Sequence, residues 1–158
     1  MKVQKLDTVA VDVKNLEEAI KFFSDILGTT FVNMGELKSD DGKPGGLIME
    51  KKVTEHANTT FEKAKARIAM DRTGFLELIE SDPPLKEGLR NIHFKVADIE
   101  KAKAEMKRRG VRLIADIRIG GLKEAIFNPD DVHGIRLCFV EYDAPTFVDA
   151  LLQKKSGK

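Results

Sequence analysis

The same pattern of residues occurs twice in this chain of 158 residues, and this internal repeat constrains the fold more than any other feature. Residues 6–28 and 89–110 share one order of alternating and helical segments, and similar runs at 75–80 and 136–141 close the two halves. Such self-similarity indicates two copies of one supersecondary unit. The repeat pairs three sets of positions across a pseudo-twofold axis: Thr8 with Asn91, Ala10 with His93, and Glu77 with Cys138.

Each copy reads as a strand, a helix and then three further strands. Residues 6–13 alternate as a strand does, and Asn15 and Gly28 are typical of a helix start and a helix end. Asp98 and Gly110 play the same parts in the second half. Because each strand has one apolar face that a helix can cover, we expect an α+β fold. Two tandem βαβββ modules would form a curved mixed sheet with a cup inside and helices on its outer face.

The predicted organisation divides the chain at one short linker. Residues 1–80 form the first module, 81–88 the linker, 89–142 the second module, and 143–158 a C-terminal helix and tail. Residues 39–65 are an insertion in the first module, with a strand predicted over 47–52 and a short helix over 60–65. A long insertion is typical of a lid or an interface, but a tolerated surface loop is an equal alternative.

Composition excludes several classes of partner. A net charge of +1 gives no electrostatic reason to bind nucleic acid or an anionic membrane. The chain has neither a long apolar run nor the apolar core of a signal peptide. A single cysteine cannot form an internal disulfide, so we expect a cytoplasmic protein.

Strand alternation gathers polar residues on the sheet face that the helices do not cover. A flat sheet would expose that face to solvent, whereas a curved sheet would turn it into a cup. The residues predicted on this face are Thr8, Asp12, Glu77, Asn91, His93, Lys95, Arg136 and Cys138.

Two of these residues are candidate catalytic groups. Glu77 is a candidate general base or metal ligand, and its alternative role is a salt bridge to Lys95 or Arg136. His93 is a candidate acid, base or ligand, or else a histidine that is only hydrogen-bonded in the cup.

Cys138 would complete a zinc-type ligand set with Glu77 and His93, or it is a small buried apolar residue. Arg136 and Lys95 would hold a carboxylate or phosphate of a substrate, or would pair with Asp12 or Glu77. Asn91 and Thr8 are further candidates for substrate binding.

The chain resembles the vicinal oxygen chelate superfamily, the group of glyoxalases, bleomycin resistance proteins and extradiol dioxygenases. The resemblance rests on residues 6–11, 16–19, 22–28, 75–78, 91–99, 127–130 and 134–141. The second half is most similar to methylmalonyl-CoA epimerase and lactoylglutathione lyase.

This resemblance implies paired βαβββ modules, a homodimer, and a divalent metal such as Zn, Ni, Co, Fe or Mn in the cup. The implied ligand positions are Thr8, Glu77, Asn91 and Cys138, of which only Glu77 is a usual ligand type of the family. The cofactor is therefore one divalent metal or none.

Three functions follow from the sequence. The first is a glyoxalase-like lyase or isomerase that moves a proton on a small carbonyl or acyl substrate. The second is a metal-free protein of the bleomycin-resistance type that sequesters a small ligand. The third is an accessory dimer with a vestigial site.

Overall fold

The structure, a computed structural model, describes residues 1–39, 47–57 and 65–153, and only the backbone of residues 36–39 and 48. The first half contains β1 (Val3–Asp12), α1 (Leu16–Leu27), β2 (Phe31–Ser39), β3 (Leu47–Val53), β4 (Lys65–Asp71) and β5 (Leu76–Asp82). The second half contains β6 (Gly88–Val96), α3 (Ile99–Arg108), β7 (Leu113–Ile119), β8 (Leu122–Phe127), a 3-10 turn (Pro129–Asp131), β9 (Leu137–Glu141) and α4 (Phe147–Leu152).

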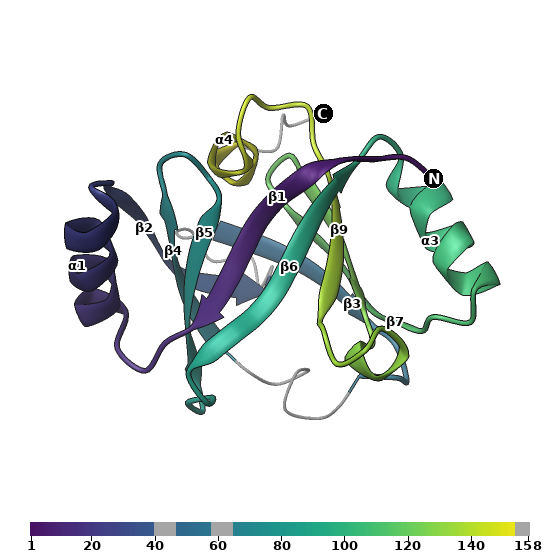
Figure 1. Ribbon diagram of the computed structural model, residues 1–158, viewed down its shortest axis with the longest axis horizontal. Coiled ribbons are helices and arrows are strands. Elements are labelled where there is room, and N and C mark those ends of the chain that lie inside the picture. The colour runs from purple at the N-terminus through teal and green to yellow at the C-terminus, as the bar shows by residue number, and fades with distance from the viewer. Residues whose placement is uncertain (40–46, 58–64, 154–158) are drawn as a thin grey trace.

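The strands of the described chain form one closed barrel with mixed strand directions (Figure 1). Its order is β1-β5-β4-β2-β3-β7-β8-β9-β6, and β6 pairs with β1 to close the ring. The pairs β1–β5 and β6–β9 are parallel, whereas β4–β5 and β8–β9 are antiparallel. The predicted α+β class with a curved mixed sheet is confirmed, and the curvature extends to closure.

Closure depends on a strand of the predicted insertion. β3 runs parallel to β2 and antiparallel to β7, so it joins the sheet of the first half to that of the second. The strand predicted over 47–52 is confirmed. The helix predicted over 60–65 falls almost wholly outside the described residues, and Lys65 begins β4.

The register of the strands reproduces the predicted twofold relation. Val9 faces Ile92 at its centre, with Thr8 facing His93 on one side and Asn91 facing Ala10 on the other. In the parallel pairs, Ala10 faces Glu77 and His93 faces Cys138. The three pairs of equivalent positions inferred from the repeat therefore occupy equivalent places.

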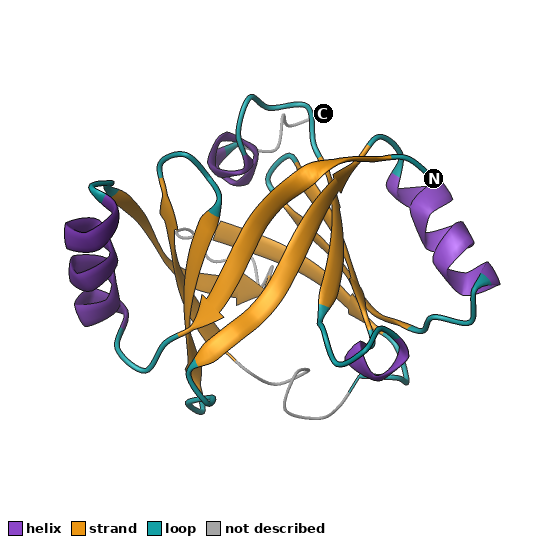
Figure 2. Ribbon diagram, viewed as in Figure 1, coloured by secondary structure: helices purple, strands orange, loops and turns teal. Residues whose placement is uncertain are grey.

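Two helices cover the outside of the barrel on opposite flanks (Figure 2). α1 packs Leu16 against Ala69 and Leu78, and α3 packs Ile99, Ala102 and Met106 against a second apolar cluster. Both helices begin at capping side chains. Asn15 accepts a hydrogen bond from the Glu18 amide, and Asp98 accepts one from the Lys101 amide.

The third described helix, α4, closes one end of the barrel (Figure 1). Phe147, Val148, Ala150 and Leu151 are buried in the interior cluster. The Phe147 ring lies 5.5 Å from the His93 ring and 6.1 Å from the Tyr142 ring, measured between centroids. None of the helices in residues 1–39, 47–57 and 65–153 is long and apolar enough to cross a membrane.

Candidate active site

A cavity of about 80 Å³ lies inside the barrel, beside the equivalent positions of the repeat. Its apolar wall consists of Met49, Ala66, Ile68, Ile79, Ile117, Ile119 and Ile126. Its polar groups are Lys51, Glu77, Arg90, Asn91, His93 and Glu124. An apolar cavity with a few converging polar groups is the usual form of a small-molecule site.

The central polar contact of this cavity joins His93 to Glu124, a residue that the sequence analysis did not select. His93 Nδ1 lies 3.1 Å from the Thr8 carbonyl oxygen, and Nε2 lies 3.0 Å from Glu124 Oε1. A carbonyl oxygen only accepts, so Nδ1 carries a proton. Nε2 then faces a carboxylate oxygen, and this contact is attractive only when a proton or a cation lies between the two atoms.

The electrostatics of the pair agree with that geometry. Burial alone would lower the pKa of His93, but the hydrogen bond and charge of Glu124 outweigh it and raise the pKa. Burial alone would raise the pKa of Glu124, but the hydrogen bond and charge of His93 lower it. The buried pair is therefore a site that holds positive charge against a carboxylate.

Cys138 lies next to this pair, with no solvent exposure. Burial raises the pKa of its thiol well above the usual range, and the Glu124 carboxylate adds to the effect. A neutral buried thiol is a poor nucleophile, so the geometry does not support covalent catalysis by Cys138.

Glu77 faces the cavity from β5 and is 8% exposed. Burial raises the pKa of its carboxyl group to about 7; the charge of His93 opposes this rise, and that of Glu124 adds to it. Arg90 and Asp12 have smaller and opposite effects, and no hydrogen bond is among the influences on Glu77. Glu77 is thus a buried acid that can gain or lose a proton near neutral pH.

Asn91 lies two residues before His93 on the same strand face and lines the same cavity. It is 6% exposed, and its Oδ1 atom is buried without a hydrogen-bond partner in the described structure. Buried polar atoms are nearly always paired, so this oxygen is an acceptor that a ligand, a water molecule or a cation can satisfy.

Arg90, which the sequence analysis also missed, reaches the cavity because β6 has an irregularity at this residue. The register shifts between Ala10–Asn91 and Val11–Leu89, which leaves Arg90 between two paired residues. Its Nη1 donates to Asp12 Oδ1 at 2.6 Å and to Ser81 Oγ at 3.1 Å. Asp12, predicted on the cup face, therefore pairs with Arg90.

The other predicted binding residues occupy different places. Thr8 is fully buried and its hydroxyl donates to the Gly74 carbonyl. Lys95 lies with its Nζ 3.6 Å from the centre of the Tyr142 ring and does not line the cavity. Arg136 is half-buried, and burial, followed by the nearby charge of Arg90, lowers its pKa.

The twofold relation gives Arg90 a counterpart, because a further register shift, between Leu6–Phe94 and Thr8–His93, leaves Asp7 between two paired residues of β1. The second shift places Asp7 on β1 where Arg90 stands on β6, and Asp7 accepts from the Tyr142 hydroxyl at 2.7 Å. Arg90 instead bonds to Ser81, the counterpart of Tyr142 in the first half. Tyr142 packs under α4, whereas the equivalent place in the first half holds the smaller side chain of Ser81.

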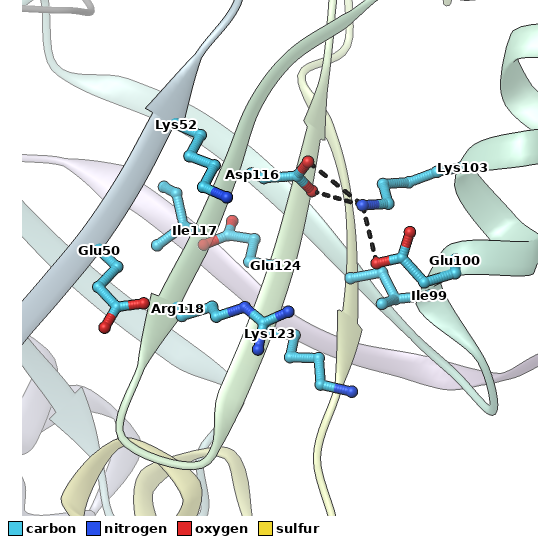
Figure 3. Close-up of a pocket in the computed structure, with 10 residues that line it drawn as sticks. All are labelled: Glu50, Lys52, Ile99, Glu100, Lys103, Asp116, Ile117, Arg118, Lys123 and Glu124. Carbon is cyan, nitrogen blue, oxygen red and sulfur yellow. Dashed lines mark hydrogen bonds and ion pairs between the residues drawn. The ribbon is translucent and has the colours of Figure 1, made fainter. Parts of the chain in front are cut away.

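A larger groove of about 330 Å³ lies on the outer side of the barrel beside α3 (Figure 3). Lys103 bridges Asp116 at 3.0 Å and Glu100 at 2.9 Å across it. Lys123 pairs with Glu141 at its edge. These cations are paired with carboxylates at a solvated surface, so the interior cavity is the better candidate for chemistry.

The fold and the cavity define a class of protein. Two βαβββ-type halves related by a pseudo-twofold axis hold acid–base groups on the inner face of their shared sheet. The family model for the Glyoxalase/Bleomycin resistance protein/Dioxygenase superfamily matches residues 5–139, and the chain belongs to this superfamily.

Solved structures support the same fold. A variant of Streptomyces coelicolor methylmalonyl-CoA epimerase in complex with 2-nitronate-propionyl-CoA matches with a TM-score of 0.59 at 18% identity, over 90% of this chain and 100% of that one. The epimerase from Mycobacterium tuberculosis matches with a TM-score of 0.58 at 16% identity, over 90% of each chain. A hypothetical protein from Bacillus halodurans C-125 matches with a TM-score of 0.55 at 19% identity, over 90% of this chain and 96% of that one. The comparison with curated proteins found no match.

Members of this superfamily commonly bind a divalent metal, and the described residues contain one group suited to it. His93, Glu124 and Cys138 present nitrogen, oxygen and sulfur atoms that lie within 4.8 Å of one another. This donor set fits a zinc-type ion, and the unpartnered Asn91 oxygen fits the same need. Glu77, predicted as a ligand with His93 and Cys138, lines the same cavity but is outside this group.

Proposed function

We propose that this protein is an enzyme that moves a proton at the carbon next to the carbonyl of a small acyl substrate, with Glu77 as the base. The observation that carries the proposal is the Glu77 carboxylate, which is buried, free of hydrogen-bond donors among the described residues, and directed at the cavity. A base that no donor stabilises retains its affinity for a proton.

In the proposed reaction the α-carbon–hydrogen bond breaks and its proton passes to Glu77. The electron pair moves onto the carbonyl oxygen to give an enolate. The Glu77 carboxyl group, whose proton can exchange with solvent, then returns a proton to the α-carbon, which restores the carbonyl group and the Glu77 carboxylate. The seven apolar wall residues keep water from this step. The enolate needs positive charge, which the Arg90 guanidinium and the protonated His93 imidazole supply from β6.

A bound divalent ion at His93, Glu124 and Cys138 would act as a Lewis acid toward the carbonyl oxygen. The roles of Glu77 as base and of the apolar wall as a barrier to water do not depend on that ion.

The cavity restricts the reacting group to a small one. Its 80 Å³ holds on the order of two or three water molecules, since each occupies about 30 Å³ of liquid volume. A short acyl head therefore enters, while the rest of a substrate stays outside. The epimerase complex that shares this fold holds an acyl thioester of coenzyme A, which supports short-chain acyl thioesters as the first substrates to test.

The test is exchange of the α-proton for deuterium in heavy water, followed by proton NMR over a panel of short-chain acyl thioesters. We expect exchange to rise as pH increases through about 7, where Glu77 loses its proton. Glu77→Gln should slow it at least about 100-fold, the lower range for a general base. Glu55→Gln changes a carboxyl group that is 83% exposed, and serves as the control.

Equal exchange in the wild type and in Glu77→Gln would contradict the proposal. Ligand-induced thermal stabilisation without exchange on any thioester would instead favour the ligand-sequestering alternative.

A further inference from the structure

The His93–Glu124 contact and the Cys138 thiol bring three ligand-type atoms together, an arrangement that the acid–base proposal does not require. Nδ1 of His93 is committed to the Thr8 carbonyl, so Nε2 presents either its lone pair or a second proton to Glu124 Oε1, 3.0 Å away. Cys138 places a third donor atom within 4.8 Å of both. Three ligand-type atoms from β6, β8 and β9 thus converge on one point that is shielded from solvent.

From this convergence we infer that His93 Nε2, Glu124 Oε1 and Cys138 Sγ bind a zinc-type divalent metal ion, with Asn91 Oδ1 as a further oxygen ligand. The inference goes beyond the proposed function, because the site would bind metal whether or not Glu77 moves a proton.

Asn91 supplies the observation that is independent of the three-residue group. Its oxygen is buried and unpartnered, and it lies on the same strand face and in the same cavity as His93 and Glu124. An amide oxygen that lacks a hydrogen-bond donor is an available ligand for a cation. A fourth ligand from this side would complete a four-coordinate centre that borders the cavity.

The surroundings suit a bound ion. The Thr8 carbonyl fixes the His93 tautomer that leaves Nε2 free to coordinate, as second partners of metal-bound histidines commonly do. The Phe147 ring packs against His93 from the α4 end, so the ion would be reached from the cavity side.

Charge and proton balance are also satisfied. A divalent cation with the Glu124 carboxylate and the Cys138 thiolate has no net charge, as a buried site requires. On binding, bonds form from the metal to nitrogen, oxygen and sulfur. Two protons leave to solvent, one from the thiol and one from the His93–Glu124 pair.

This ligand set differs from the one that the family resemblance implies. Cys138 and Asn91 belong to both sets, but His93 and Glu124 replace Thr8 and Glu77. The difference can be tested, because Glu77 is essential in one set and dispensable in the other.

The experiment titrates Co²⁺ into full-length protein that has been stripped with a chelator, and follows the near-ultraviolet thiolate-to-cobalt band and the visible bands of the ion. We expect one Co²⁺ per chain with a thiolate band, and competition by one equivalent of Zn²⁺. Cys138→Ala should abolish the band, and Glu124→Gln should weaken binding at least about 100-fold. Glu77→Gln should bind Co²⁺ as the wild type does, which separates failure of this inference from failure of the proposed function.

Far-ultraviolet circular dichroism on each variant shows whether it is folded, and Cys138→Ser serves as a second substitution if Cys138→Ala does not fold. Absence of the thiolate band in the folded wild type would overturn the inference and leave a proton shared by His93 and Glu124. A thiolate band lost in Glu77→Gln and kept in Glu124→Gln would overturn it in favour of the ligand positions implied by the family.

Discussion

At the scale of single residues, the burial of Glu77 affects both the stability of the fold and the ability of its carboxyl group to accept a proton. Most carboxylates of the described chain are stabilised in the charged form by a nearby cation or amide, as Glu105 is by Arg108 and Arg109. Glu77 is buried without such a partner, so the folded protein holds it in its neutral form up to about pH 7. Above that pH the carboxylate is charged without a partner, and this charge lowers the stability of the folded protein. Carboxyl groups with such a perturbed pKa are common at catalytic sites.

This condition predicts a specific dependence of stability on pH. The unfolded chain titrates Glu77 near 4.5 and the folded chain near 7, so the stabilisation present below 4.5 is lost as pH rises to 7. Glu77→Gln cannot ionise and should not lose it. We compare the free energy of unfolding of the variant with that of the wild type at each pH. Between pH 4 and a pH above 7, this difference should shift by about 3 kcal/mol in favour of the variant, from 1.36 kcal/mol per pKa unit.

Urea unfolding of both proteins at a series of pH values measures this difference, and comparing the two cancels the titration of all other groups. A constant difference across the range would show that Glu77 titrates normally, and would remove the support that its environment gives to a base.

Two of the cavity residues that sequence reasoning missed, Arg90 and Glu124, were hidden for different physical reasons. Arg90 reaches the cavity only because a strand irregularity interrupts the alternation that assigned neighbouring residues to faces. Glu124 lies between Leu122 and Ile126 on the inward face of β8. A charged residue between two apolar residues of one strand face is a sequence signal that could have identified it as a site residue. His93, Asn91 and Glu77 were found because regular alternation holds where they lie.

At the scale of elements, α4 depends on the tight turn between β7 and β8. The Gly121 amide donates to the Ala150 carbonyl at 2.8 Å. A Cβ atom at Gly120 would lie 2.6 Å from the Leu151 carbonyl oxygen and 2.7 Å from that of Ala150. The helix that closes the barrel over His93 therefore packs on a turn that accommodates no side chain at this position.

Gly120→Ala should consequently destabilise the protein more than Gly110→Ala does. Both glycines have positive φ, 55° at Gly120 and 79° at Gly110, so both substitutions incur the backbone strain of about 1 kcal/mol. Gly110 has open space around it, whereas Gly120→Ala must also displace the α4 backbone. We expect an excess loss of at least about 1 kcal/mol in urea unfolding, and equal losses would show that α4 does not pack as described.

The order of elements could be predicted from the sequence because strand alternation, helix caps and the repeat agree with one another. The pairing partner of the inserted strand could not be predicted. The sequence of residues 47–52 favours a strand. It does not show which strands this one pairs with, because β2 and β7 belong to different halves of the chain.

At the scale of the whole molecule, the barrel has approximate twofold symmetry, and α4 packs into the interior at one of its ends. Asp7 and Arg90 occupy equivalent places, yet Asp7 meets Tyr142 under α4 while Arg90 meets the smaller Ser81. The repeat thus supplies two equivalent positions whose hydrogen-bond partners differ in size. The homodimer and the cytoplasmic location expected from the sequence stay predictions, and the dimer can be tested by analytical ultracentrifugation.

The inserted strand β3 should set the size of substrate that the interior cavity accepts. Its side chains alternate, with Met49 and Lys51 lining the cavity and Glu50 on the outer face. Met49→Ala removes part of the apolar wall, so the cavity should accept an acyl group longer by one or two carbons. From the usual effect of a methylene group in an apolar pocket, we expect kcat/KM for the longer thioester to rise about 10-fold relative to the shorter one.

Initial rates of α-proton exchange on a series of acyl thioesters of increasing length measure this shift, with Glu50→Ala as the matched change on the opposite face of the same strand. An equal shift in both variants would indicate a general loosening of β3. No shift in Met49→Ala would show that the strand closing the barrel leaves substrate selection to other walls. A shift confined to Met49→Ala would mean that an insertion in one repeat, by joining the two halves, also determines what reaches Glu77.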